Sequence, residues 1–243
     1  MDIRVFDGEG QVARAVADRI SAAIRATPAL VIGLPTGRTP LGTYEQLRSL
    51  HAAGAADFSR VSTFNLDEFV GLGTRDPGSF RFYMTRKLFE AVNLDPARIH
   101  FLDGTARDLA AECDRYEREI HDAGGIDLQV LGIGRNGHIG FNEPGDELIA
   151  RTHRVTLADS TRRDNAAAFG GNLSHVPREA LSMGMGTILK ARRLVLVATG
   201  AAKARCIERA VRGPLTTRLP ASFLQLHARV ELYLDRPAAA LLV

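Results

Sequence analysis

Residues 126–144 read IDLQVLGIGRNGHIGFNEP. The first six of them, Ile126 to Leu131, are an apolar segment that predicts a buried strand. The loop that follows holds four glycines, a histidine, two asparagines and a glutamate. In an open α/β sheet, ligands bind where strands end in such loops, at the carboxyl edge of the sheet. This stretch therefore predicts both the kind of sheet and the place of a site on it.

The same loop carries groups that are suited to proton transfer. Glycines let the backbone turn sharply and approach a ligand closely. His138 can carry protons near neutral pH, and Glu143, five residues on, can orient the imidazole or tune its pKa. A structural turn with a hydrogen-bonded histidine is the alternative. Because loops carry binding groups disproportionately, we favour a functional site.

Helical and strand patterns alternate along the chain. This alternation predicts a Rossmann-like α/β fold: a doubly wound, mostly parallel sheet with helices on both faces. We expect one domain over residues 1–243, a length that suits a single large core. The expected helices span residues 10–26, 40–50, 79–89, 109–123, a segment near Arg178, and 201–212. The expected strands span residues 29–34, 61–66, 126–131, 154–157, 193–199 and 230–234.

Two strand-to-helix junctions offer groups for an anion. Residues 33–40 combine small residues and hydroxyls with a helix start, where backbone N–H groups point outward. This loop matches neither a Walker loop nor a GxGxxG fingerprint, and a plain tight turn is the alternative. Lys203 lies in the first turn of the last predicted helix, which is unfavourable for the helix dipole. An anion held there would remove that penalty, whereas a solvated lysine is the alternative.

Asp67 and Glu68 follow the strand predicted over residues 61–66. Adjacent carboxylates point in different directions, so we expect only one of them to face a ligand. Asp67 is a candidate general base, and a helix cap or a solvated charge pair is the alternative. Together the junctions place anion donors, a carboxylate and a His/Glu pair along one sheet edge. That combination suits a sugar phosphate.

Composition argues against several other classes of protein. The formal net charge is +3, but Lys87, Lys190 and Lys203 are the only lysines and the arginines are dispersed, so we expect no nucleic-acid binding. No apolar run reaches the length of a membrane span, and the first residues lack a secretory signal, so we expect a cytoplasmic protein without membrane contact. Cys113 and Cys206 should be free thiols. Without a metal-like cluster or dinucleotide fingerprint, we expect no metal and no cofactor.

With these residues the chain resembles the glucosamine-6-phosphate deaminase (isomerase) family. The most specific shared element is G-x-G-x-(N/D)-G-H-I-x-F-N-E-P, at residues 132–144. The resemblance covers essentially the full chain in order, and it includes residues 33–40, 64–69, 200–203 and 220–227. It implies a fold of the sugar-phosphate isomerase type. It also implies the reversible conversion of glucosamine 6-phosphate and water to fructose 6-phosphate and ammonia in amino-sugar catabolism, without an organic cofactor.

The resemblance also implies a role for each matching residue. Asp67 resembles the base that moves a proton between C2 and C1 through an enolamine. His138 resembles the group that opens the pyranose ring by proton transfer to the ring oxygen, with Glu143 and Asn136 as its partners. Because an amide cannot ionise, Glu143 is the ionisable partner. The phosphate grip is implied for Thr36, Gly37, Arg38, Thr39 and Lys203.

Two departures from the family concern its phosphate site. Many members have an arginine where this chain has Ala167, and a glycine where it has Arg38. The basic effector positions of the allosteric hexameric members, near residues 151–155, are not clearly kept, and the chain stops soon after its last predicted strand. We therefore expect no allosteric activation. The oligomeric state is left open, with a homo-oligomer as one alternative.

Three other functions are weighed against this one. Galactosamine-6-phosphate deamination needs only a different recognition of one hydroxyl. The 6-phosphogluconolactonases, which are hydrolases, share the glycine loop and the Asp-Glu pair, but their histidine loop continues in an H-T-A-S-L-F-P-like manner. A transcription regulator that senses sugar phosphates would usually carry a helix-turn-helix, for which we expect no room before residue 29. Such a sensor would also have no need of Asp67, His138 and Glu143.

Overall fold

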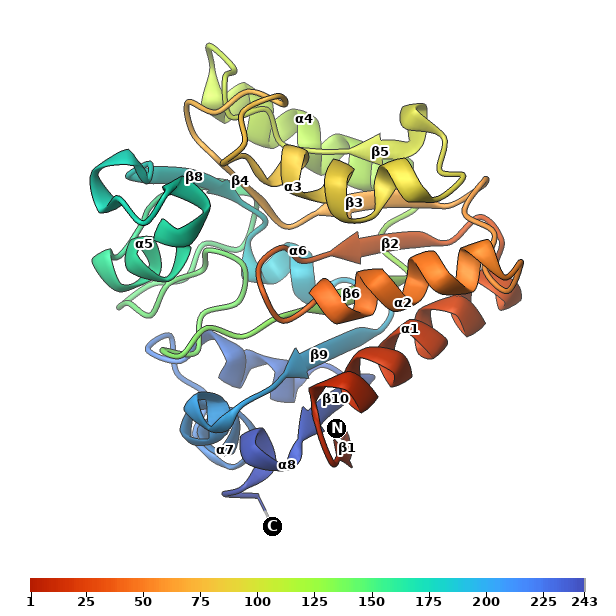
Figure 1. The fold of residues 1–243 in the computed structure, drawn as a ribbon. Helices are drawn as coiled ribbons and strands as arrows, with labels where there is room; N and C mark the ends of the chain where they lie inside the picture. The colour runs from red at the N-terminus through yellow and green to blue at the C-terminus, as the bar shows by residue number, and fades with distance from the viewer. Residues whose placement is uncertain (243) are drawn as a thin grey trace.

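Seven parallel strands form the central sheet of the computed structural model, which describes residues 1–242 (Figure 1). Every neighbouring pair in this sheet is parallel, so the predicted doubly wound, mostly parallel architecture is confirmed. In spatial order the strands are β1 (Asp2–Phe6), β10 (Val230–Asp235), β9 (Leu194–Ala198), β6 (Leu128–Leu131), β2 (Val31–Leu34), β3 (Ser62–Asn65) and β5 (Ile99–His100).

The direction in which the sheet grows reverses beside β2. Strands β3 and β5 extend it to one side, whereas β6, β9 and β10 extend it to the other. The register aligns the strand ends, because Leu34 pairs with Asn65 and Leu131 pairs with Leu196. The loops that leave these strands therefore begin side by side at one edge of the sheet. Such a switch point is where doubly wound folds bind ligands.

Helices cover both faces of the sheet (Figure 1). The first face is covered by α1 (Glu9–Ala26), α2 (Leu41–Ala52) and α3 (Phe80–Lys87). The other face is covered by α4 (Leu109–Asp122), α6 (Met185–Leu189) and α7 (Ala204–Arg212), and α8 (Arg236–Ala239) follows the last strand. Because both faces are covered, the central strands are apolar on both sides, as the fully buried β9 with its sequence LVLVA shows.

A serine cap and a pair of glycines bound two of these helices. Ser79 caps α3, because its Oγ accepts a hydrogen bond of 3.0 Å from the Phe82 N–H. The pair Gly124-Gly125 follows the end of α4. The thiols of Cys113 and Cys206 are both free and buried, as expected.

A second, antiparallel sheet lies beside the first. It consists of β4 (Asp67–Phe69), β8 (Glu179–Ser182) and β7 (His153–Thr156), and α5 (Asp159–Asn165) packs next to it. The helix predicted near Arg178 is wrong, because this segment is the middle strand β8. Pairing on both sides decides its conformation: β8 bonds to β4 and β7, and the carbonyl of Arg178 accepts the Leu157 N–H at 2.9 Å.

Several short elements escape the sequence patterns. The edge strand β1 is mostly exposed and β5 has two residues, so neither has the continuous apolar run of a central strand. Strand β4 directly follows β3 and becomes visible only through its partner β8. Short 3-10 turns occupy Phe89–Ala91, Pro96–Arg98, Ala166–Phe169, Leu173–His175, Ala201–Lys203 and Pro220–Leu226.

Candidate active site

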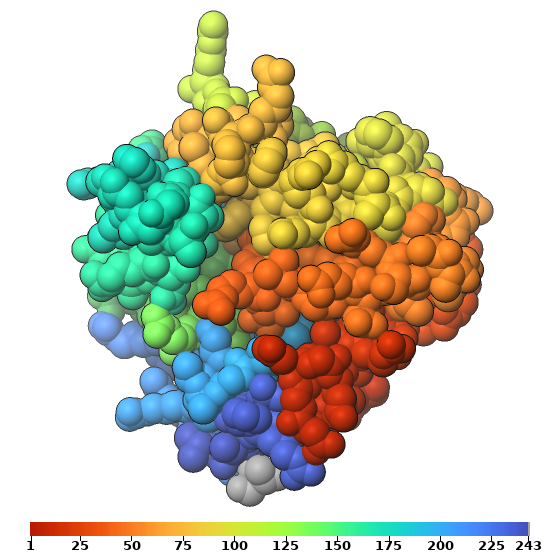
Figure 2. Space-filling view, in the orientation of Figure 1, coloured from red at the N-terminus to blue at the C-terminus, as the bar shows by residue number. Residues whose placement is uncertain are grey.

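A cleft of about 970 Å³ opens at the switch point between β2 and β6. The loops after β2, β6 and β9 form its walls, together with the start of α1 and the beginning of β4. In Figure 2 the red, orange, green and blue segments that carry these walls meet near the centre of the face. The cleft lies within the size range of small-molecule sites.

Asp67 reaches this cleft from the first residue of β4. Its side chain is buried, and its Oδ1 makes no hydrogen bond to any of residues 1–242. Burial, with a contribution from the neighbouring Glu68 charge, raises the pKa of Asp67 to about 8, although the Thr36 hydroxyl opposes that rise. A carboxyl group with a pKa close to neutral pH is well matched to general base catalysis.

Glu68 points away from the cleft, as the alternation of adjacent side chains predicts. Its carboxylate accepts hydrogen bonds from the backbone N–H groups of Phe69, Phe80 and Arg81 at 2.8, 3.0 and 2.9 Å. Two of these donors belong to the first turn of α3, so Glu68 satisfies N–H groups at a helix start. The two adjacent carboxylates therefore have different surroundings, and only Asp67 faces the cleft.

His138 and Glu143 adjoin in the loop after β6. The His138 Nδ1 lies 3.6 Å from the Glu143 Oε2, which is longer than a hydrogen bond but close enough for an ion pair. Asn136 joins them: its Nδ2 donates to the same Oε2 at 2.9 Å, and its Oδ1 accepts the His138 N–H at 3.2 Å. His138 lines the cleft, whereas Asn136 and Glu143 are outside its lining.

Glu143 carries its charge despite being largely covered. Burial alone would raise its pKa, but His138, Thr161 and Asn136 together hold the pKa of Glu143 below its usual value. An ionised Glu143 therefore places a negative charge 3.6 Å from the imidazole Nδ1 of His138.

Two glycines allow the close contacts of this loop. A side chain at Gly134 would collide with the imidazole of His138, since an added Cβ would lie 2.4 Å from its ring carbon. Gly140 has a φ of +58°, and a Cβ there would meet the Ser182 Oγ at 3.2 Å and the Asp67 Oδ2 at 3.6 Å. The loop at residues 132–144, called the histidine loop below, therefore packs directly against the side chain of Asp67.

The predicted anion loop forms the opposite wall of the cleft. Thr36, Gly37, Arg38 and Thr39 all line it. The N–H groups of residues 37–39 donate to no backbone carbonyl or side chain of residues 1–242, so they are free for an anion. The loop is held from behind, because the Tyr83 hydroxyl donates to the Gly37 carbonyl at 2.6 Å.

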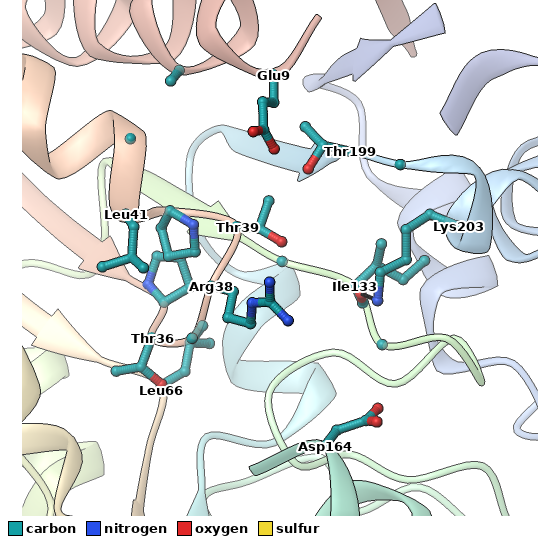
Figure 3. A pocket seen from close by; sticks show the side chains of 18 of the residues that line it. Glu9, Thr36, Arg38, Thr39, Leu41, Leu66, Ile133, Asp164, Thr199 and Lys203 are labelled. Carbon is teal, nitrogen blue, oxygen red and sulfur yellow. Dashed lines mark hydrogen bonds between the residues drawn. The ribbon is translucent and has the colours of Figure 1, made fainter. Parts of the chain in front are cut away.

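Two cations point into the space beside this loop. Figure 3 shows the Arg38 guanidinium and the Lys203 ammonium directed toward each other across the cleft, with the Thr39 hydroxyl nearby. The Lys203 Nζ donates to the Ile133 carbonyl at 2.8 Å, and burial lowers the pKa of this lysine. The Arg38 side chain makes no hydrogen bond or ion pair within residues 1–242. Lys203 is therefore not a fully solvated lysine, and the two cations have donors left for a phosphate.

The structure brings further residues to the site that the sequence patterns did not single out. The Thr161 hydroxyl donates to the Glu143 Oε1. Arg135 forms an ion pair with Asp164, and both residues line the cleft. The only sequence signal near Thr161 was the departure from the family pattern at Ala167. A contact between residues so far apart in the chain leaves no pattern in one sequence.

The structure also places the residues around Ala167, where many family members have an arginine. Ala167 is exposed and lies outside the cleft lining. Arg162 is buried and its Nη2 donates to the carbonyls of Leu173 and Val176 at 2.8 and 3.0 Å, so it is not available for a phosphate. Among residues 1–242, no group of three or more His, Cys, Asp or Glu side chains could hold a metal ion. No helix in the same range is long and apolar enough to cross a membrane.

Comparisons with known proteins agree over the whole chain. Residues 9–233 match the family described as glucosamine-6-phosphate isomerases/6-phosphogluconolactonase. A glucosamine-6-phosphate deaminase of Halothermothrix orenii is 46% identical over 242 residues, which cover 100% of both chains. The glucosamine-6-phosphate deaminase 1 of Bacillus subtilis is 45% identical over 227 residues, 93% of each chain.

Solved structures agree with these sequence matches. A structure described as a monomeric glucosamine-6-phosphate deaminase has a TM-score of 0.96 and 41% identity, and the match covers 99% of this chain and 100% of that one. A 6-phosphogluconolactonase of Thermotoga maritima has a TM-score of 0.74 at 18% identity over 96% and 98% of the two chains, which shows a shared fold alone. The chain belongs to the family of glucosamine-6-phosphate isomerases and 6-phosphogluconolactonases.

Proposed function

We propose that this protein is a glucosamine-6-phosphate deaminase, which converts glucosamine 6-phosphate and water to fructose 6-phosphate and ammonia. The observation that carries the proposal is the place of Asp67. A buried carboxyl group of raised pKa faces a cleft that has an anion loop on one wall and a His/Glu pair on another. The two curated relatives, which cover 100% and 93% of this chain, are named glucosamine-6-phosphate deaminases, and this supports the choice within the family.

Each group of site residues serves one step of the proposed reaction. The anion loop, Arg38 and Lys203 hold the phosphate at one end of the cleft. His138, polarised by the ionised Glu143, moves a proton from the anomeric hydroxyl to the ring oxygen, and the pyranose opens to the aldehyde. Asp67 then removes the C2 proton, which gives an enolamine, and returns a proton to C1. The resulting C2 imine takes up water and releases ammonia, so the reaction needs no electron carrier.

Burial of Asp67 has a cost that fits this role. A carboxylate that accepts no hydrogen bond at Oδ1 is poorly stabilised, so the base is strong enough to take a proton from carbon. Burial also raises the pKa of the neighbouring Glu68, to about 7, but the three N–H bonds that its carboxylate accepts oppose the rise. The arrangement resembles other active sites in which two carboxyl groups differ through their surroundings.

Galactosamine 6-phosphate is the second candidate substrate, because it differs from glucosamine 6-phosphate at one hydroxyl. The lactonase alternative is disfavoured, since the histidine loop of this chain continues H-I-G-F-N-E-P and the lactonase likeness extends to the fold alone. The single domain, the cytoplasmic location and the oligomeric state stay predictions from the sequence.

The direct test is ammonia release from the two amino-sugar phosphates, measured side by side with purified protein. We expect turnover of glucosamine 6-phosphate with a higher kcat/KM than of galactosamine 6-phosphate. Release of ammonia from galactosamine 6-phosphate alone would make that compound the substrate in place of glucosamine 6-phosphate. Hydrolysis of 6-phosphogluconolactone without any ammonia release would refute the deaminase assignment.

Asp67→Asn keeps the shape of the side chain and removes its basicity. We expect kcat to fall at least about 10²-fold, the lower range for a positioned acid or base. The variant should also be more stable than the wild type at pH 8. A carboxyl group whose folded pKa is about 8 loses stability as the pH rises from its unfolded value near 4 toward 8. Asparagine does not titrate and escapes that loss.

Thermal unfolding of Asp67→Asn at pH 5 and pH 8 checks the predicted gain in stability. The gain in Tm over the wild type should be about 4 °C or more at pH 8 and smaller at pH 5. Asp114→Asn, at an exposed carboxylate, is the control and should leave Tm nearly unchanged. A wild-type kcat for Asp67→Asn, or an equal Tm gain at both pH values, would contradict the role given to Asp67.

His138→Gln separates ring opening from the later steps. The proposed role predicts a large loss of kcat on glucosamine 6-phosphate, whose ring must open. The loss should be smaller on its 5-O-methyl analogue, which cannot form the pyranose ring. Ammonia release from both compounds gives the comparison. Equal losses on the two substrates would assign His138 to another step.

Arg38 should supply the phosphate-binding charge that Ala167 cannot. Hydrogen bonds to charged groups contribute roughly 1.5–3 kcal/mol, so Arg38→Gly should raise KM about ten- to a hundred-fold. Adding Ala167→Arg to that variant should restore KM in part or in full. Ala167→Arg alone is the control for the new side chain. An unchanged KM in Arg38→Gly would leave Lys203 and the loop N–H groups to hold the phosphate.

A further inference from the structure

Thr161 connects two segments that are distant in the sequence. It lies in α5, beside the antiparallel sheet, and it is 2% exposed. Its hydroxyl donates to the Oε1 of Glu143, which belongs to the loop after β6. A threonine in a short helix is therefore buried with its only hydroxyl directed at a carboxylate of the candidate active site.

This contact determines which oxygen of Glu143 is left for the histidine. The Oε2 accepts the Asn136 Nδ2 at 2.9 Å and lies 3.6 Å from the His138 Nδ1. The Oε1 has Thr161 as its partner. A carboxylate turns easily about its last bond, since that torsion is broad. With both oxygens engaged, the group is held with Oε2 toward the imidazole.

The backbone of Thr161 is fixed from the cleft side. The Asn165 Nδ2 donates to the Thr161 carbonyl at 2.9 Å, and Asn165 itself lines the cleft. One turn along the same helix, Asp164 pairs with Arg135 in the histidine loop. The two segments are thus joined at two points, and the Thr161 hydroxyl is the one that touches the proton-transfer group.

We propose that Thr161 is a positioning residue for ring opening: its hydroxyl orients Glu143 so that the Oε2 serves His138. The inference rests on the proposed deaminase function. Thr161 touches neither the reacting atoms nor the cleft, so it acts through Glu143 alone. It should therefore influence the rate of the ring-opening step and leave the phosphate grip and the Asp67 step unaffected.

Thr161→Val removes the hydroxyl and keeps the shape. We expect kcat on glucosamine 6-phosphate to fall about ten-fold, as for loss of one hydrogen bond to a charged group, with KM changed by less than about two-fold. Thr161→Ser keeps the hydroxyl and should retain most of the wild-type kcat. On the 5-O-methyl analogue, which has no pyranose ring to open, Thr161→Val should lose little.

Thr152→Val is the matched control. Thr152 is also buried and its hydroxyl donates to a glutamate, Glu117, at 2.7 Å, but neither residue lines the cleft. Its substitution should cost stability without altering kcat. If Thr161→Val does not fold, Thr161→Ala replaces it, because alanine removes the hydroxyl without adding a methyl group.

Three outcomes would overturn the inference. They are an unchanged kcat in the folded variant without the hydroxyl, an equal loss on the cyclic substrate and the 5-O-methyl analogue, and a Thr161→Ser variant as slow as Thr161→Val. A wild-type protein that releases no ammonia from either amino-sugar phosphate would instead refute the proposed function. The two failures are therefore distinguishable.

Discussion

The parallel pairing of β2 with both β3 and β6 is the constraint on which the other features depend. From β2 the chain builds the sheet first to one side and then to the other, so the loops after β2 and β6 diverge and leave a crevice between them. The register then brings the ends of β3 and β9 to the same edge. Groups from four separate parts of the sequence meet there because hydrogen-bonded strands place them together.

Within that crevice, none of the groups that shift the pKa of Asp67 is a cation. The anion loop carries unpaired N–H groups and the Arg38 guanidinium, which points toward Lys203 across the cleft (Figure 3), whereas Asp67 lies at the start of β4 and packs against the loop after β6. This arrangement matters because a cation beside Asp67 would lower its pKa and weaken it as a base. Burial has the opposite effect, and the low polarity around Oδ1 is what keeps the proton affinity of Asp67 high.

The two departures from the usual family pattern, Ala167 and Arg38, can be explained by where each side chain starts and what it bonds to. The arginine that many members have at the position of Ala167 would come from the segment after α5, whereas Arg38 points into the cleft from the anion loop. Arg162 cannot substitute, because its guanidinium is committed to two carbonyls. Different elements can thus supply the positive charge at a phosphate site, as long as the side chain is long and its charged group is not already bonded to other groups of the protein.

The sequence by itself determined the elements with strong local signals. The apolar runs predicted the central strands, the helical pattern over residues 79–89 predicted α3, and the loop at residues 132–144 identified His138 and Glu143. The alternation of neighbouring side chains also separated Asp67 from Glu68. Only the tertiary structure decided the strand at residues 179–182, the raised pKa of Asp67 and the contact between Thr161 and Glu143. These depend on partners far away in the chain, and neither burial nor a long-range hydrogen bond has a local signature.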